Sequence, residues 1–165
     1  MSPRSASRPL ALSAIALVSL VLTGCAATVS LEPAADAKAT ACADVVVRLP
    51  STVADQSARE TDAQGTGAWG DPAAVLLRCG VPSPGPTTQE CVSVNGVDWI
   101  QDDSDAPKYR FTTFGRTPAV EVILDYDIVS GSTTLADLAS AVSVIAPTAQ
   151  CTDVTDVPDP EATAG

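Results

Sequence analysis

The most specific chemical signal in this chain is the cysteine at position 25. It ends the run Leu22-Thr-Gly-Cys25, in which an aliphatic residue and two small residues precede the thiol. Arg4 and Arg8 lie ahead of it, followed by the apolar stretch 10–22, which is too short for a usual membrane span and typical of an export signal. This pattern matches the lipobox of bacterial lipoproteins, whose thiol accepts a diacylglycerol.

We therefore predict a signal peptide over 1–24 and a lipid anchor at Cys25, on the extracytoplasmic face of the cell membrane. The alternative is an ordinary signal peptide followed by a free cysteine. The predicted anchor accounts for the odd number of cysteines, because the chain contains five.

The other four cysteines are expected to form two disulfides, since an even set in an exported protein is typical of a covalent framework. They are Cys42, Cys79, Cys91 and Cys151, and three pairings are open. We favour Cys79–Cys91, which would join neighbouring strands across the proline-rich turn 81–86. Cys42–Cys151 would then join the two ends of the domain. Metal binding is disfavoured because no CxxC motif occurs.

Several kinds of catalysis are excluded by composition. The chain has no histidine, which removes the usual Ser-His-Asp and Cys-His sites and histidine-containing zinc sites. No SxxK motif, P-loop or GxGxxG occurs. Carboxylates are plentiful, so an acid/base pair remains open but has no location. The run Asp102–Asp105 lacks the spacing of a calcium loop, and we interpret it as a solvated acidic loop. We predict no catalytic residue and no cofactor.

Four residues are candidates for ligand binding. Trp69 and Trp99 stand beside turns in a chain with only 4% aromatic residues. The favoured interpretation is that both close a core. The alternative is a stacking platform for a sugar or a peptide, with Arg78 or Arg116 supplying charge. Arg116 would lie at a hairpin tip, where exposed contact residues are common.

The charge of the chain restricts its partners. It has 165 residues, enough for one domain, with 9 basic and 20 acidic side chains and a formal net charge of −11. This excess of negative charge argues against binding of nucleic acid, which requires a positively charged surface, and against adsorption to anionic lipid. The remaining partners are the membrane, through the anchor at Cys25, and an envelope ligand or protein.

The central element is expected to be a strand over 73–77. This run is wholly apolar and is bounded by the breakers 70–72 and 80–86, which leave too little room for a typical helix. Arg78 follows the run. We interpret it as the partner of a carboxylate at the rim of the sheet. The alternative is an anion-binding residue at a cleft.

Patterns elsewhere predict further elements. Alternation and turn residues indicate two hairpins, and helical periodicity indicates a C-terminal helix. The predicted segments are a strand over 45–49, a short helix over 51–60, a hairpin over 91–100 that turns at Asn95-Gly96, a hairpin over 108–126 and a helix over 134–146. They combine into one α+β domain over 42–151, with a mostly antiparallel sheet of five or six strands and the C-terminal helix on one face. We expect a flexible tether over 25–41 and a disordered acidic tail over 152–165.

Four motifs resemble a known family. They are Ala68-Trp-Gly-Asp-Pro72, Leu77-Arg-Cys-Gly-Val81, Val94-Asn-Gly-Val-Asp-Trp99 and the run 111–122. In this order they resemble an uncharacterised actinobacterial secreted family, the domain of unknown function 3515, over about 42–151. Phe114 stands where that family leads us to expect tyrosine. The resemblance implies an exported, often membrane-anchored envelope protein, and it supplies no activity or site residue.

These observations together favour a non-enzymatic binding or accessory module at the cell envelope. One alternative is a hydrolase or transferase that acts on wall material through carboxylates. The other is a structural subunit of a membrane complex.

Overall fold

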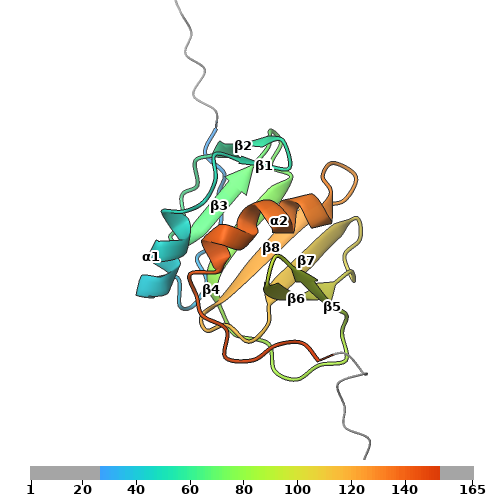
Figure 1. Ribbon diagram of the computed structural model, residues 1–165. Helices are drawn as coiled ribbons and strands as arrows, with labels where there is room; N and C mark the ends of the chain where they lie inside the picture. Colours follow the sequence, from blue (N-terminus) through green and yellow to red (C-terminus); the bar gives the residue numbers. More distant parts are fainter. Residues whose placement is uncertain (1–26, 153–165) are drawn as a thin grey trace, which may run out of the picture.

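The computed structural model describes residues 27–152 (Figure 1). The predicted signal peptide, Cys25 and nearly all of the predicted acidic tail lie outside these residues. Within them, the chain forms two helices, α1 (Thr40–Val46) and α2 (Gly131–Val142). It also forms eight strands: β1 (Thr52–Val53), β2 (Gln56–Arg59), β3 (Thr66–Trp69), β4 (Val75–Val81), β5 (Cys91–Val94), β6 (Val97–Asp102), β7 (Lys108–Thr113) and β8 (Ala119–Asp125).

All eight strands belong to one antiparallel sheet in the order β1-β2-β3-β4-β8-β7-β6-β5. Each half of the sheet is a meander that begins at an edge and ends at the centre, where β4 pairs with β8 in the register Leu77↔Val122. The antiparallel sheet and the C-terminal helix are confirmed, but the sheet has more strands than predicted. The extra strands β1 to β3 have two to four residues each. Such strands are too short to show the alternation of apolar and polar residues that predicts a strand.

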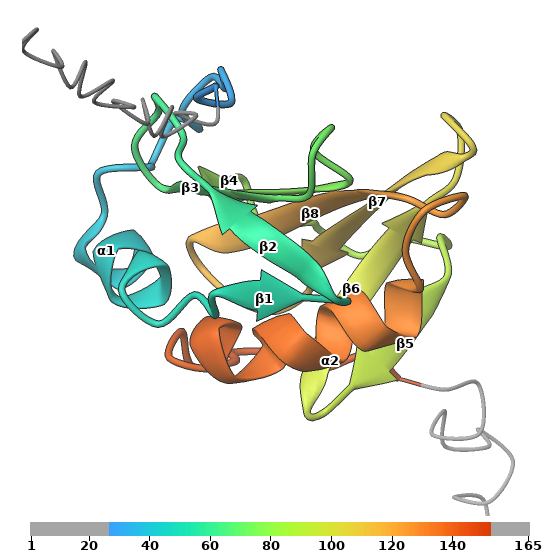
Figure 2. The same cartoon turned by 90° about the horizontal axis from the view of Figure 1, so that it is seen from above.

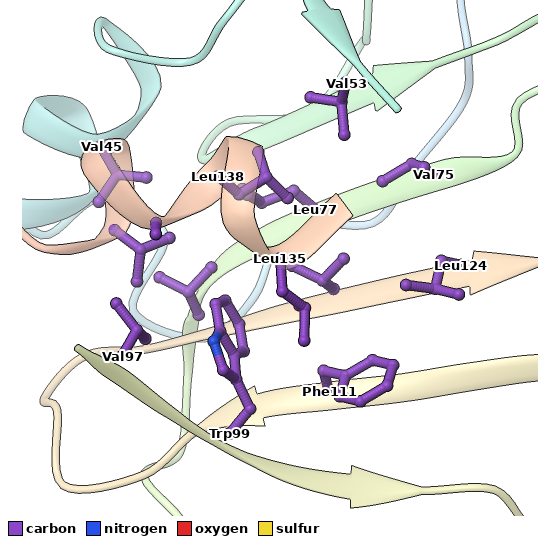
Figure 3. Packing of buried hydrophobic residues seen from close by; sticks show 14 of the residues in the cluster. Val45, Val53, Val75, Leu77, Val97, Trp99, Phe111, Leu124, Leu135 and Leu138 are labelled. Atoms are coloured by element: carbon purple, nitrogen blue, oxygen red, sulfur yellow. The ribbon is translucent and has the colours of Figure 1, made fainter. Parts of the chain in front are cut away.

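Helix α2 lies across one face of the sheet, which curls around it, so that α2 contacts both β1 and β5 at the two edges (Figures 1 and 2). Leu135 and Leu138 point from α2 into a core that contains Leu77, Trp99 and Phe111 (Figure 3). The helix begins earlier than predicted because Ser130 is its cap and accepts a hydrogen bond from the backbone N–H of Thr133. We call this covered face the concave face.

Two local predictions near the N-terminus are wrong. The valine-rich segment 45–49 was expected to be a strand, but Val45 lies in the last turn of α1 and is fully buried. Segment 51–60 was expected to be a helix but forms β1 and β2, joined by Ala54 and Asp55 at positive φ. This turn is held against α2 because Ala54 N–H donates to Asp137 Oδ2 over 2.8 Å. Tertiary contacts therefore override local propensity in both segments.

The folded chain extends N-terminally beyond the domain boundary that we predicted at residue 42. Val29 forms a parallel bridge with Thr61, and Asp36 N–H donates to Gly80 O over 3.0 Å. Gly80 has a φ of 103°, and a Cβ there would collide with the backbone of Asp36 and Ala37. Figure 2 shows the segment ahead of α1 beside β3, on the side of the sheet away from α2. Residues 27–39 are thus part of the domain, in contrast to the tether that we expected.

The disulfides also differ from our prediction. Cys42 pairs with Cys79, which ties α1 to β4, and Cys91 pairs with Cys151, which ties β5 to the C-terminal segment. Three strands separate β4 from β5, so Cys79 and Cys91 are four strand spacings of about 4.8 Å apart. A disulfide tolerates a Cα separation of only about 4.4–6.8 Å. Segment 81–86 is therefore part of a crossover and not a hairpin turn.

Candidate functional site

The face of the sheet away from α2, which we call the convex face, carries a group of charged side chains on its central strands. Side chains alternate between the two faces along each strand. Val75, Leu77 and Cys79 of β4 point into the core, so Leu76 and Arg78 point outward. On this side of the sheet, none of the helices in residues 27–152 lies over the central strands (Figure 2). The convex face is formed there by Leu76, Arg78, Asp102, Lys108, Arg110, Thr112, Glu121 and Ile123.

Four charges of alternating sign cross this face on neighbouring strands. Arg78 donates to the same oxygen of Glu121 through Nε over 2.9 Å and Nη2 over 2.7 Å. Arg110 Nε lies 3.5 Å from the other oxygen of Glu121. Asp102 stands opposite Arg110 in the register of β6 and β7. The row Asp102, Arg110, Glu121 and Arg78 is therefore a continuous line of complementary charges.

Glu121 is the least exposed member of this row. Its side chain is 7% exposed, against 31% for Arg78 and 47% for Arg110. A carboxylate so far from water needs opposite charges and hydrogen bonds to offset the cost of its burial, and the two guanidiniums supply them. The arginines therefore hold the carboxylate in place while their own outer edges stay open to solvent.

A hollow of about 270 Å³ lies beside this row. Leu76 and Ile123 contribute apolar side chains to it, while Lys108 and Arg110 contribute positive charge. Asp102 also lines it, and hydrogen bonds from the Ser104 side chain and backbone hold the pKa of the Asp102 carboxyl below its usual value. This carboxylate is suited to accept hydrogen bonds or attract a cation, and unsuited to donate a proton at neutral pH.

Of the four predicted binding residues, only Arg78 lies on the convex face. It forms an ion pair with a carboxylate as we expected, but its partner Glu121 lies on the central strand β8 and not at the rim of the sheet. Two donors of Arg78, Nε and Nη2, are bonded to Glu121. Arg78 therefore does not form the open anion-binding site of the alternative interpretation. The acceptor was not identified from the sequence. Arg78 and Glu121 face each other because β4 and β8 pair, and the two residues are far apart in the chain.

The two tryptophans do not form a stacking platform. Trp69 is 1% exposed and Trp99 is fully buried, so neither ring is open to a ligand. Trp69 Nε1 donates to Pro50 O over 3.0 Å. Figure 3 shows Trp99 under α2, on the concave face. The favoured interpretation, in which both close the core, is confirmed, and the platform alternative is wrong.

Arg116 is buried and not exposed at a hairpin tip. Its guanidinium donates to Ile145 O and, over 3.1 Å, to Gly96 O. Burial lowers the pKa of Arg116, and the charge of Asp98 opposes this by raising it. The turn is covered because the C-terminal segment crosses it: Thr148 N–H donates to Gly115 O over 2.6 Å. Arg116 therefore joins three parts of the chain and does not meet the other candidate residues.

Sequence reasoning missed Arg110 and Glu121 as members of the site. The alternation in 108–113 and 119–125 that marks Phe111 and Val122 as core residues also places Arg110 and Glu121 on the opposite face. That signal was present in the sequence. Their meeting depends on the pairing of β7 with β8, which alternation does not specify.

Comparison with known protein families gives a match over residues 10–151 to the family described as Protein of unknown function (DUF3515). The chain belongs to this family. The match includes all four disulfide-bonded cysteines and every residue of the convex face. No curated protein and no solved structure matches the chain.

Two further observations concern membranes and metals. Neither helix between residues 27 and 152 has the length and apolar character needed to span a bilayer. In the same part of the chain, no three His, Cys, Asp or Glu side chains are grouped so as to hold a metal ion. The acidic turn at 102–105 is a solvent-exposed loop in which Asp102 accepts from the backbone N–H of Ser104.

Proposed function

We propose that this protein is a lipid-anchored module on the outer side of the cell membrane, which binds a protein partner through the convex face and catalyses no reaction. The observation that carries the proposal is a sheet face whose centre is covered by no helix of residues 27–152, where the half-buried apolar side chains of Leu76 and Ile123 lie beside a fixed row of charges. Faces of this composition suit partners with complementary charge.

A protein partner fits this face better than a small molecule does. Small-molecule sites are usually concavities of about 300–1,000 Å³ that enclose most of the ligand. The hollow beside Arg110 measures about 270 Å³, below that range, whereas the charged row extends across four strands. The lowered pKa of Asp102, which its hydrogen bonds with Ser104 cause, also weighs against the alternative of a hydrolase that uses this carboxylate as an acid.

The alternative of a purely structural subunit finds less support. Such a subunit would dock through one contiguous apolar patch. The large apolar side chains that are exposed in the described part of the chain lie on separate elements. They are Val47 after α1, Tyr126 and Ile128 after β8, and Val144 after α2.

Lipid attachment is supported by the run Leu22-Thr-Gly-Cys25 and is tested directly by Cys25→Ser. We expect the parent protein to incorporate labelled palmitate and to sediment with membranes, and the variant to do neither. A variant that still carries the label would contradict the assignment of the anchor to Cys25.

Binding through the convex face is tested by site-specific photo-cross-linking in the native membrane. A photoreactive amino acid at Thr112, which lies opposite Glu121 and leaves all four charges of the row in place, should yield a discrete protein adduct. The matched control is Ser140, an exposed position of α2 on the other side of the molecule. Adducts of equal yield from both positions, or from Ser140 alone, would contradict the proposal.

Charge reversal then tests the role of the row. Arg110→Glu should abolish the adduct formed from a photoreactive residue at the neighbouring Thr112, because it places a negative charge beside Glu121 and toward the partner. Arg48→Glu on α1 is the control, since Arg48 is 51% exposed and lies outside the convex face. An adduct that survives Arg110→Glu would show that the row does not contribute to binding.

A further inference from the structure

The described part of the chain begins two residues after the predicted lipid anchor. Ala27 O accepts a hydrogen bond from Arg59 Nη2 over 2.6 Å. The same guanidinium donates through Nη1 to Gly70 O over 2.8 Å and pairs with Asp71 Oδ1 at 2.9 Å. The Arg59 side chain is only 10% exposed. Ala27 is therefore fixed against the end of the sheet where β3 turns into β4.

The residues that follow Ala27 are bonded just as closely. Val29 N–H donates to Glu60 O over 2.8 Å, and Val29 O accepts from Asp62 N–H over 3.3 Å. The Asp62 carboxylate accepts from Leu31 N–H over 2.9 Å and from the Ser30 hydroxyl over 2.8 Å. This leaves no flexible spacer in the described chain between Ala27 and the domain.

Covalent geometry then limits how far the domain can stand from the lipid. Two residues span at most about 7 Å, even when fully extended. An acylated Cys25 lies with its chains in the bilayer, so Ala27, Arg59 and the turn at Gly70 must lie close to the headgroups. Figure 1 shows this end of the domain (blue, at the top) opposite the C-terminal end (red, at the bottom).

Three turns share that end of the sheet. The register pairs Val75↔Leu124 and Lys108↔Asp125 place the start of β4, the end of β8 and the start of β7 side by side. The turns 70–74, 103–107 and 126–130 therefore form one surface, which we call the proximal end. Ile128 is 51% exposed there and Tyr126 is 42% exposed, and these side chain types suit the interface between headgroups and acyl chains.

We infer that the proximal end rests directly on the lipid surface. This inference depends on the lipid anchor of the proposed function and adds to it a fixed orientation of the domain. The strands then stand upright on the membrane, and the convex face points sideways, toward proteins embedded beside it. The proximal end also carries Asp71, Asp103, Asp105 and Asp127, all exposed, so contact should be closer on zwitterionic than on anionic lipid.

Tryptophan quenching in vesicles tests this orientation with the lipidated chain. Ile128→Trp places a ring at the proximal end, across the sheet from Ala27. Val47→Trp is the control, because Val47 is 77% exposed and lines a hollow with Gln64 and Gly65 at the opposite end of β3. The native tryptophans are buried and supply a constant background. The vesicles contain phosphatidylcholine brominated close to the headgroup.

We expect loss of most of the emission added by Ile128→Trp and no loss of that added by Val47→Trp. A spacer of about ten Gly and Ser residues between Cys25 and Ala27, about 17 Å in root-mean-square length, should abolish the difference. Equal quenching at both positions, or none at either while the protein stays on the vesicles, would overturn the orientation and leave the anchor intact. Failure of the lipidated protein to associate with vesicles would overturn the anchor as well as the orientation.

Discussion

At the scale of single residues, the convex face depends on one carboxylate. Glu121 is almost fully withdrawn from solvent, and it accepts from Arg78 while lying beside Arg110. Both arginines are partly exposed and can contact a partner. Because each lies against Glu121, the carboxylate fixes the position from which they do so. The same residue therefore contributes to stability and sets the arrangement of positive charge on the surface.

Glu121→Gln should lower the free energy of unfolding by about 1–3 kcal/mol, because it keeps the size of the side chain and leaves two guanidiniums without their anion. Urea denaturation of the oxidised domain measures this change. Asp71→Asn is the control: Asp71 also pairs with an arginine, but its side chain is 79% exposed, and we expect at most about 1 kcal/mol. Equal effects of the two substitutions would show that burial of Glu121 is not what matters.

Arg116→Lys should destabilise the domain by about 1–3 kcal/mol, although it preserves the charge. A single ammonium cannot reach both Ile145 O and Gly96 O, so one buried acceptor loses its donor. Arg48→Lys on the exposed surface of α1 is the matched control and should change stability by less than about 0.5 kcal/mol. Thermal unfolding of both variants under oxidising conditions measures the two changes in stability, and equal changes would contradict the role of the buried guanidinium.

At the scale of elements, we predicted correctly those segments whose own residues show a clear turn or alternation pattern, and we missed those that lack one. The hairpins β5–β6 and β7–β8 are confirmed. Asn95 and Gly96 supply the two positive-φ positions of the tight turn in the first hairpin, and alternation marks the strands of the second. Strands β1 and β2 have two and four residues and depend on pairing with each other and with β3. No local pattern distinguishes such short strands from a loop or a helical turn.

The contact of Ser30 and Leu31 with the Asp62 carboxylate should weaken as the solution becomes acidic. Hydrogen bonds from Leu31 N–H and the Ser30 hydroxyl lower the pKa of Asp62 below its ordinary value of 3.8. Because the folded-state pKa is the lower one, this stabilisation is complete above the ordinary pKa and is lost as pH falls through the folded-state value. The protection factor of the Leu31 amide, taken against its intrinsic exchange rate at each pH, should therefore fall below about pH 4.

Asp62→Asn separates this effect from general acid unfolding. The amide should show fast exchange at Leu31 already at neutral pH, with little further change on acidification. Amides in the central strands β4 and β8 serve as the internal control, since they do not contact Asp62. Protection at Leu31 that persists in the variant would contradict this role of Asp62.

At the scale of the whole molecule, two disulfides secure opposite ends of the chain to the sheet. Cys42–Cys79 holds α1 against a central strand, and Cys91–Cys151 holds the C-terminal segment against an edge strand. Each terminal segment also crosses a glycine, Gly80 or Gly115, where a side chain would collide with its backbone. The N-terminal and C-terminal segments of residues 27–152 are thus each held on the sheet by a disulfide and by close contact with a glycine.

Mass spectrometry of a non-reduced digest should find the peptides Cys42–Cys79 and Cys91–Cys151. The loops span 37 and 60 residues, so removal of either bridge should lower stability by about 4 kcal/mol through the entropy of the unfolded chain. Cys42→Ser and Cys79→Ser should have equal effects, because each removes the same bridge. Recovery of a Cys79–Cys91 peptide would contradict the strand order of the sheet.

The sequence alone was enough for those features that depend on near neighbours. These are the two hairpins, the C-terminal helix, the core positions of Trp69 and Trp99, and the exclusion of histidine chemistry. Tertiary structure decided the order of the strands, the partners of the cysteines, the acceptor of Arg78 and the burial of Arg116. The physical reason is that turn conformation and hydrophobic periodicity depend on residues that are close together in the chain. Contacts such as Arg78 with Glu121 arise only when distant strands pair, and the pairing is chosen by the burial of the whole core.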